Sequence, residues 1–142
     1  MAMMRRKGGP RPIPLGLQIA NMAVRFPGFR FDRKTMSWHG HFQPAADSPR
    51  YRVELGYRPP LSPKVWIRGP VLHPNAKHRY ADGSLCLYDP RAGEWHSGLF
   101  LSETIAPWAA EWLFYYEAWL VDPQKRWFGP EAPHGPLKRP AR

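Results

Sequence analysis

The strongest constraint on the fold is one long apolar segment, SETIAPWAAEWLFYYEAWLVD, at residues 102–122. Its apolar side chains recur at intervals of three and four residues, which is the pattern of an amphipathic helix. Pro107 falls in the first turn, where its missing N–H does little harm. Asp122 precedes a proline and therefore disfavours helical geometry. The sequence predicts a helix over residues 104–121.

This helix is apolar on more than the one side that a sheet would cover. Phe114, Tyr115 and Ala118 lie opposite its main apolar stripe, where they are accompanied by glutamates. A helix that is apolar on most sides is covered on more than one side. We expect one side to pack on a sheet and the other to meet either residues 127–130 or a partner protein.

Three segments before the helix alternate apolar and polar residues with period two, which is typical of half-buried strands. They are residues 36–43, 51–58 and 64–68, and each is followed by proline or glycine. Because the connections are short and carry no crossover helix, an antiparallel meander is expected. Strands followed by a helix predict an α+β domain in which the sheet lies on the helix.

A chain of 142 residues fits one domain with one hydrophobic core. We interpret residues 1–14 as a basic tail rich in proline and glycine, residues 15–130 as the domain, and residues 131–142 as a second basic tail. Residues 16–23 form either a short helix or an extended lead-in. We expect no membrane span and no secretory signal, because no apolar run has the required length. One cysteine suits a reducing compartment, so we expect a cytoplasmic protein.

The net charge of +10 is concentrated at the two ends of the chain. Seven basic residues lie within residues 1–12 and 138–142, which leaves 14 basic and 11 acidic residues between these ends. Short basic tails of this composition are usually solvated. Since no basic patch is visible on a predicted element, the charge argues against nucleic acid as a partner. A basic nucleic-acid-binding protein stays open as an alternative function.

The one cysteine, Cys86, lies in the segment HPNAKHRYADGSLCLYDP, which covers residues 73–90. A lone cysteine is most often a packing residue, but here polar groups suited to acyl transfer lie close in sequence. Acyl transfer through a thiol needs a thiolate and a hydrogen-bond donor for the oxyanion. The side-chain N–H of Asn75 can be that donor, and His73-Pro74 would hold its backbone in a fixed loop.

The order of elements and motifs resembles the ubiquitin-conjugating enzyme family over roughly residues 33–121. The shared features, in chain order, are a strand meander, a proline-rich turn, His73-Pro74-Asn75, Gly83-Ser84-Leu85-Cys86-Leu87, Trp95 and an amphipathic helix. The resemblance implies a ubiquitin-conjugating (UBC) fold that lacks a long N-terminal helix. It also implies that Cys86 accepts an activated C-terminal carboxylate as a thioester, that Asn75 stabilises the oxyanion, and that His73 organises the loop. No cofactor is implied, because the energy arrives with the activated donor.

Two segments, DGSLCLYDP and SETIAPWAAEWLFYYEAWL, resemble a narrower group of compact bacterial conjugating-enzyme-like proteins. These are encoded in antiphage cyclic-oligonucleotide signalling (CBASS) operons beside a cGAS-like nucleotidyltransferase. The resemblance implies that the C-terminus of this synthase is the acyl donor and that Cys86 transfers it to an amine such as lysine, which regulates the synthase. Whether a separate activating enzyme takes part stays open.

The spacing inside the Cys86 segment adds one structural requirement. Asn75 and Cys86 are 11 positions apart, so residues 76–82 must loop out if the two side chains are to meet. Asp89 and His96 are candidates for positioning the incoming amine, and a role in local turns is the alternative for both.

Two other kinds of site compete with thioester chemistry. A metal site could be assembled from His39, His41, His73, His78 and Cys86, although their spacing does not match zinc motifs. A non-catalytic UBC-fold scaffold is the second alternative. The presence of both Cys86 and Asn75 favours the enzyme.

Overall fold

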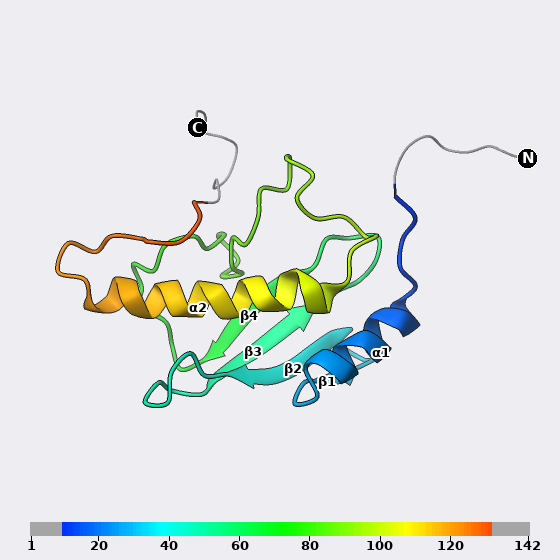
Figure 1. The fold of residues 1–142 in the computed structure, drawn as a ribbon, viewed down its shortest axis with the longest axis horizontal. Helices are drawn as coiled ribbons and strands as arrows, with labels where there is room; N and C mark the ends of the chain where they lie inside the picture. Colours follow the sequence, from blue (N-terminus) through cyan, green and yellow to red (C-terminus); the bar gives the residue numbers. More distant parts are fainter. Residues whose placement is uncertain (1–9, 132–142) are drawn as a thin grey trace, which may run out of the picture.

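One four-stranded sheet packs on one long helix in the computed structural model, which describes residues 10–131 (Figure 1). The elements are, in chain order, α1 (Leu15–Arg25), β1 (Arg30–Asp32), β2 (Ser37–Phe42), β3 (Tyr51–Gly56), β4 (Lys64–Gly69), the 3-10 helix η1 (Leu101–Glu103) and α2 (Ile105–Val121). The predicted α+β class, with an antiparallel meander packed on a helix, is therefore confirmed.

The sheet has the strand order β1-β2-β3-β4, and every neighbouring pair is antiparallel. The three predicted strands are present as β2, β3 and β4, with ends that differ from the prediction by one or two residues. Strand β1 was not predicted, because three residues between two turns are too few to show an alternation. It extends the meander by pairing Phe31 with Trp38.

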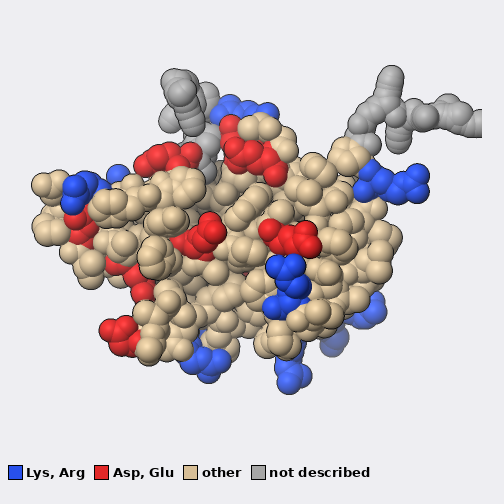
Figure 2. Space-filling view, in the orientation of Figure 1, with Lys and Arg blue, Asp and Glu red and all other residues tan. Residues whose placement is uncertain are grey.

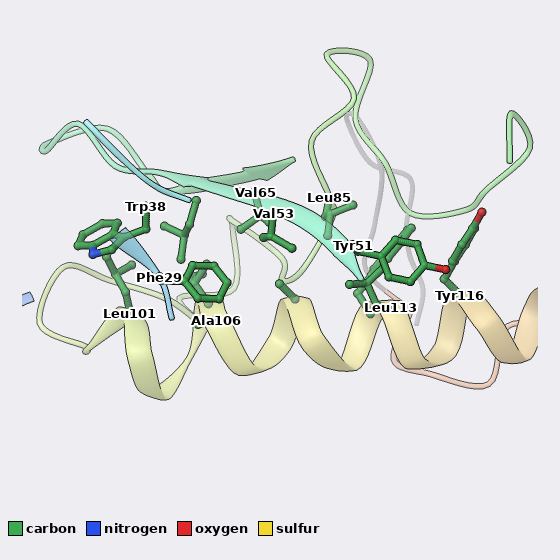
Figure 3. Close-up of a cluster of buried hydrophobic side chains, with 14 of the residues drawn as sticks. Phe29, Trp38, Tyr51, Val53, Val65, Leu85, Leu101, Ala106, Leu113 and Tyr116 are labelled. Atoms are coloured by element: carbon green, nitrogen blue, oxygen red, sulfur yellow. The ribbon is translucent and has the colours of Figure 1, made fainter. Parts of the chain in front are cut away.

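The core lies between the sheet and α2, as Figure 3 shows. Trp38, Val53 and Val65 point from the sheet toward the helix, and each is at most 3% exposed. Ala106 and Leu113 meet them from α2, and both are at most 1% exposed. Burying one large apolar side chain contributes about 1.5–3 kcal/mol, so this layer of contacts is the main source of the stability of the fold.

Residues 16–23, for which the sequence left a short helix and an extended lead-in open, lie in helix α1, which has 11 residues. Its buried side includes Gln18, and both polar atoms of the Gln18 side-chain amide have hydrogen-bond partners. Nε2 of Gln18 donates to the carbonyl oxygen of Leu99 (3.0 Å), and its Oε1 accepts from the backbone N–H of Leu101 (2.9 Å). These bonds fix α1 against the chain that enters α2. No longer helix precedes the sheet within residues 10–131.

The predicted helix over residues 104–121 is α2, which starts one residue later than expected. Thr104 occupies the N-cap position, but its hydroxyl makes no capping bond to the helix. It donates to the carbonyl oxygen of Phe100 (2.8 Å) and accepts from Nε1 of Trp95 (3.1 Å). Thr104 therefore ties the preceding loop to the start of the helix.

The predicted domain boundaries near residues 14 and 130 stay predictions. Helix α1 begins at Leu15, and the backbone N–H of Ile13 donates to the carbonyl oxygen of Ser97 (2.8 Å). Most of the two predicted tails, residues 1–9 and 132–142, lies outside the described residues. In the part of the chain that is described, no helix has both the length and the apolarity needed to cross a membrane.

Candidate active site

A tight turn after β4 shapes the segment that carries the cysteine. The backbone N–H of Gly83 donates to the carbonyl oxygen of Tyr80 (2.9 Å), and the N–H of Tyr80 donates to the carbonyl oxygen of Ser84 (2.8 Å). Gly83 has a φ of +88°, in the left-handed region that glycine adopts without strain. The Asp82-Gly83 pair therefore closes a short hairpin over residues 78–86.

The hairpin pairs Cys86 with His78 and is attached to the sheet. The backbone N–H of Cys86 donates to the carbonyl oxygen of His78 (2.7 Å). The backbone N–H of Leu85 donates to the carbonyl oxygen of Val65 in β4 (2.9 Å). The second half of residues 76–82 does not loop out, so the condition under which Asn75 and Cys86 would meet is not fulfilled in this structure. These residues fold back on the cysteine, because the pairing satisfies backbone groups that a loop would leave to water.

The thiol of Cys86 is buried, with the residue only 3% exposed. Burial raises its pKa to about 12, although a hydrogen bond from the Tyr80 side chain acts in the opposite direction. The pKa of Tyr80 is also raised to about 12, first by burial and then by the adjacent Cys86. In this conformation the thiol is protonated at neutral pH, so it is a weak nucleophile.

Cys86 borders a cavity of about 270 Å³ between the hairpin, the loop that follows it, α2 and residues 127–131. Its other lining residues are mainly aromatic (Tyr88, Trp108, Trp112, Tyr115 and Trp127) or acidic (Asp89, Glu94, Glu111 and Glu131). Within residues 10–131, no lysine or arginine lines it. On the face in Figure 2, acidic side chains lie across the middle and over α2, whereas Lys and Arg lie mostly toward the edges. The cavity is therefore suited to a cationic group.

The two candidates for positioning an amine lie in different surroundings. Asp89 lines the cavity, and its Oδ1 accepts from the backbone N–H of Arg91 (2.9 Å). His96 is not among the described lining residues, and its Nδ1 accepts from the N–H of Gly98 (3.1 Å). His96 thus makes the turn contact that was its alternative role, while Asp89 combines a turn contact with a place at the cavity.

His73 docks its loop on the C-terminal half of α2. Its backbone N–H donates to the hydroxyl of Tyr116 (2.8 Å), and its ring lies edge-on to Trp119, with 5.3 Å between the ring centroids. Its Nδ1 accepts from the backbone N–H of Asn75 (3.0 Å). The position of the following residues therefore depends on His73.

Asn75 and Cys86 are not brought together in this conformation. Asn75 is exposed, and it is not among the described residues that line the cavity. The side chain of Tyr80, rather than that of Asn75, lies within hydrogen-bonding distance of the thiol.

Sequence reasoning missed the contribution of residues near the C-terminus to this site. Nε2 of the buried His78 lies 3.0 Å from Oε1 of Glu131, and the His78 ring lies 5.0 Å from the ring of Trp127. The sequence had suggested His78 as one of the polar groups near Cys86 that suit acyl transfer and as a metal ligand, but not as a contact of residues near the C-terminus. The Asp82-Gly83 pair, flanked by Tyr80 and Leu85, was the signal for a hairpin that would place His78 beside Cys86.

The described residues do not bring together the side chains that the alternative prediction of a metal site requires. His39 and His41 are exposed on β2, and His73 contacts Trp119 instead. No group of three His, Cys, Asp or Glu side chains in residues 10–131 could hold a metal ion.

An antiparallel meander packed on a helix, with a cysteine at a cavity beside that helix, is compatible with the E2, or ubiquitin-conjugating, class of protein. The family model for the type II CBASS E2 protein matches residues 18–135. This match covers most of the chain, and the chain belongs to that family. The resemblance to CBASS conjugating-enzyme-like proteins is therefore confirmed, and the chain is an E2 protein of an antiphage system. No curated protein sequence matches it.

Proposed function

We propose that this chain is a UBC-fold conjugating enzyme in which Cys86 forms a thioester with the C-terminus of the CBASS cyclic-nucleotide synthase. It then transfers that C-terminus to an amine, such as a lysine, and so regulates the synthase. The observation that carries the proposal is the place of Cys86 at an acidic and aromatic cavity beside α2. Family membership supports the CBASS setting. We expect the reaction in the cytoplasm, where a single cysteine stays reduced.

The reaction has two acyl-transfer steps. In the first, the thiolate of Cys86 attacks the activated carbonyl carbon of the donor, and the activating group leaves with its electron pair. In the second, a neutral amine attacks the thioester carbon, loses a proton, and expels the Cys86 thiolate to leave an amide. The donor arrives already activated, and an activating enzyme is one source of it.

The acidic lining of the cavity supports an amine as the acceptor. A lysine reaches the site as an ammonium ion, and carboxylates of Asp89, Glu94 and Glu111 at the cavity would attract it. One of these carboxylates can then take up the proton that the amine must lose before it attacks. Aromatic walls add attraction for a cation that has left water.

In this proposal Asn75 stabilises the oxyanion and His73 organises the loop. The contacts of His73 with Tyr116, Trp119 and the Asn75 backbone support its part. Asn75 is exposed, so its amide reaches the reacting carbonyl only after the loop adjusts to the bound donor.

The burial of Cys86 favours a second candidate function, that of a non-catalytic scaffold. A thiol that is 3% exposed, with a pKa raised by burial, matches a packing residue. In that case the cavity would bind a partner without acylation.

A trapping experiment separates the two functions. The synthase is co-expressed with wild type, Cys86→Ser or Cys86→Ala, and intact masses are measured under non-reducing conditions. The enzyme predicts a thioester with wild type that neutral hydroxylamine cleaves, an oxyester with Cys86→Ser that resists it and no adduct with Cys86→Ala. If neither adduct forms with an activated synthase C-terminus while the two proteins still bind each other, the scaffold is the correct function.

A further inference from the structure

The chain reverses direction after α2 and runs back along the helix toward Cys86. Figure 1 shows these residues, 122–131, in orange beside α2, and we name them the strap. The carboxylate of Asp122 holds the reversal by accepting from the backbone N–H (2.7 Å) and the guanidinium Nε (3.0 Å) of Arg126. Lys125 within this turn has a φ of +53°. The start of the strap is therefore built from local contacts.

The middle of the strap is seated on aromatic side chains of α2. The Trp127 ring lies 5.6 Å from that of Trp112 and 6.2 Å from that of Tyr115. Gly129 crosses directly over Tyr115, since a Cβ at this position would lie 2.4 Å from the Tyr115 ring. A side chain at position 129 would therefore push the strap away from the helix. Of the two expectations for the second side of this helix, contact with residues 127–130 is confirmed at Tyr115, whereas Phe114 on that side stays 59% exposed.

The end of the strap closes on the hairpin that carries the thiol. Oε1 of Glu131 lies 3.0 Å from Nε2 of His78, and the backbone of His78 pairs with that of Cys86. Trp127, Pro130 and Glu131 form one wall of the cavity that Cys86 borders. The strap therefore lies between this cavity and the solvent on that side.

The attachment of the strap differs from that of a strand. Among the described residues, no backbone hydrogen bond joins residues 127–131 to α2 or to the hairpin. The seat includes ring contacts and the contact of Nε2 of His78 with the exposed carboxylate of Glu131, which is an ion pair when His78 is protonated. Segments held in this way open at a lower free energy than the global unfolding of a core.

We propose that the strap is an autoinhibitory cover, which must leave α2 before a donor carboxylate can reach the thiol of Cys86. The nature of the donor rests on the proposed function, whereas the covering of the thiol does not. A donor brings both its reacting carbon and the chain that leads to it. Cys86 is only 3% exposed at the edge of this cavity, and three residues of the strap form one wall of it, so a donor that brings both cannot reach the thiol in this arrangement.

The test is the rate at which iodoacetamide alkylates Cys86 in the full chain under native conditions, followed by intact mass. Trp127→Ala removes the ring that seats the strap, and Gly129→Val forces the backbone away from Tyr115. We expect both variants to react at least about tenfold faster than wild type. Phe128→Ala is the matched control, because Phe128 lies in the same segment but is 55% exposed and contacts Arg126. Its rate should equal that of wild type.

Global unfolding would also expose the thiol, so each rate is measured again at low urea concentrations. Opening of the strap exposes little surface and leaves the rate nearly flat, whereas unfolding makes the rate rise steeply with urea. Faster alkylation with a flat urea dependence supports the cover. Rates equal to wild type in both strap variants overturn it, and so does an increase that follows the urea dependence of unfolding.

The same variants are then tested for the thioester with the synthase. Fast alkylation without any thioester would overturn the proposed function and leave the cover in place. A normal thioester in wild type with unchanged alkylation in the strap variants would overturn the cover and leave the function in place.

Discussion

The two sides of α2 are covered in different ways. Toward the sheet, Ala106, Ala109 and Leu113 are almost fully buried among residues of an antiparallel sheet. Toward the strap, Tyr115 is only half-buried although Trp112 is 4% exposed, and both rings meet a segment that has no backbone pairing with the helix among the described residues. The sheet side of α2 therefore supplies most of the stability. On the other side, the strap is attached more weakly to the helix, and this is the side on which Cys86 and its cavity lie. The difference indicates that the strap side is the part of the molecule that can move.

The largest effect should come from the sheet side. Leu113→Ala removes a side chain that is 0% exposed, and we expect it to lower the free energy of unfolding by about 2–5 kcal/mol. Trp127→Ala, on the strap side, should lower it by only about 1–2 kcal/mol although the deleted group is larger. Urea denaturation measures both values. Equal losses would mean that the strap is part of the cooperative core and that the two sides of α2 do not differ in attachment.

The pH dependence of Cys86 alkylation measures how completely the strap side of α2 is closed. Burial raises the pKa of this thiol to about 12, so the wild-type rate should rise about tenfold per pH unit between pH 7 and 10 without a plateau. In Trp127→Ala the thiol should titrate nearer its ordinary pKa of about 8.5, and the rate should level off by about pH 10. A wild-type profile that levels off near pH 9 would show that the thiol is already uncovered.

The same pKa shift has a consequence for stability, whose sign follows from proton linkage. The folded chain holds the Cys86 proton more tightly than the unfolded chain does. Its contribution to stability is therefore complete below about pH 8.5 and is lost as the pH rises toward 12. Cys86→Ser should lack this part of the alkaline dependence.

The smallest effect should come from the ion pair at the end of the strap. His78 is buried, but the carboxylate of Glu131 is 67% exposed, so solvent screens the contact and we expect it to contribute about 0–1 kcal/mol, as exposed pairs do. We therefore expect Glu131→Gln to raise the alkylation rate by no more than about fivefold, less than Gly129→Val does. An effect as large as that of Gly129→Val would place the main attachment of the strap at its end rather than at its aromatic seat.

Most of the sheet side could be predicted from the sequence, because it depends on periodic patterns. The alternation around Trp38 and Val53, and the spacing of Ala109 and Leu113, each appear within a single element. The short strand β1 could not be predicted, since its three residues pair with β2 without a pattern of their own.

The site could be predicted only in part, because its geometry depends on contacts between distant segments. The sequence indicated that Cys86 lies near turns, but its burial depends on the pairing with His78 and the hydrogen bond with Tyr80. Residues 127–130 were recognised as one possible cover of the helix, yet their place at the cavity follows from the reversal at Asp122. The roles of Asn75, His73 and Cys86 in transfer stay predictions.

The seat of the strap also provides an optical signal that needs no label. Trp127 lies against Trp112 and Tyr115, and such close aromatic pairs contribute to the near-ultraviolet circular dichroism of a packed protein. Departure of the strap would remove that contribution while the far-ultraviolet spectrum of the helices and sheet stays unchanged. The difference spectrum between wild type and Gly129→Val would identify the signal, and the binding of a donor could then be followed through the chain's own tryptophans.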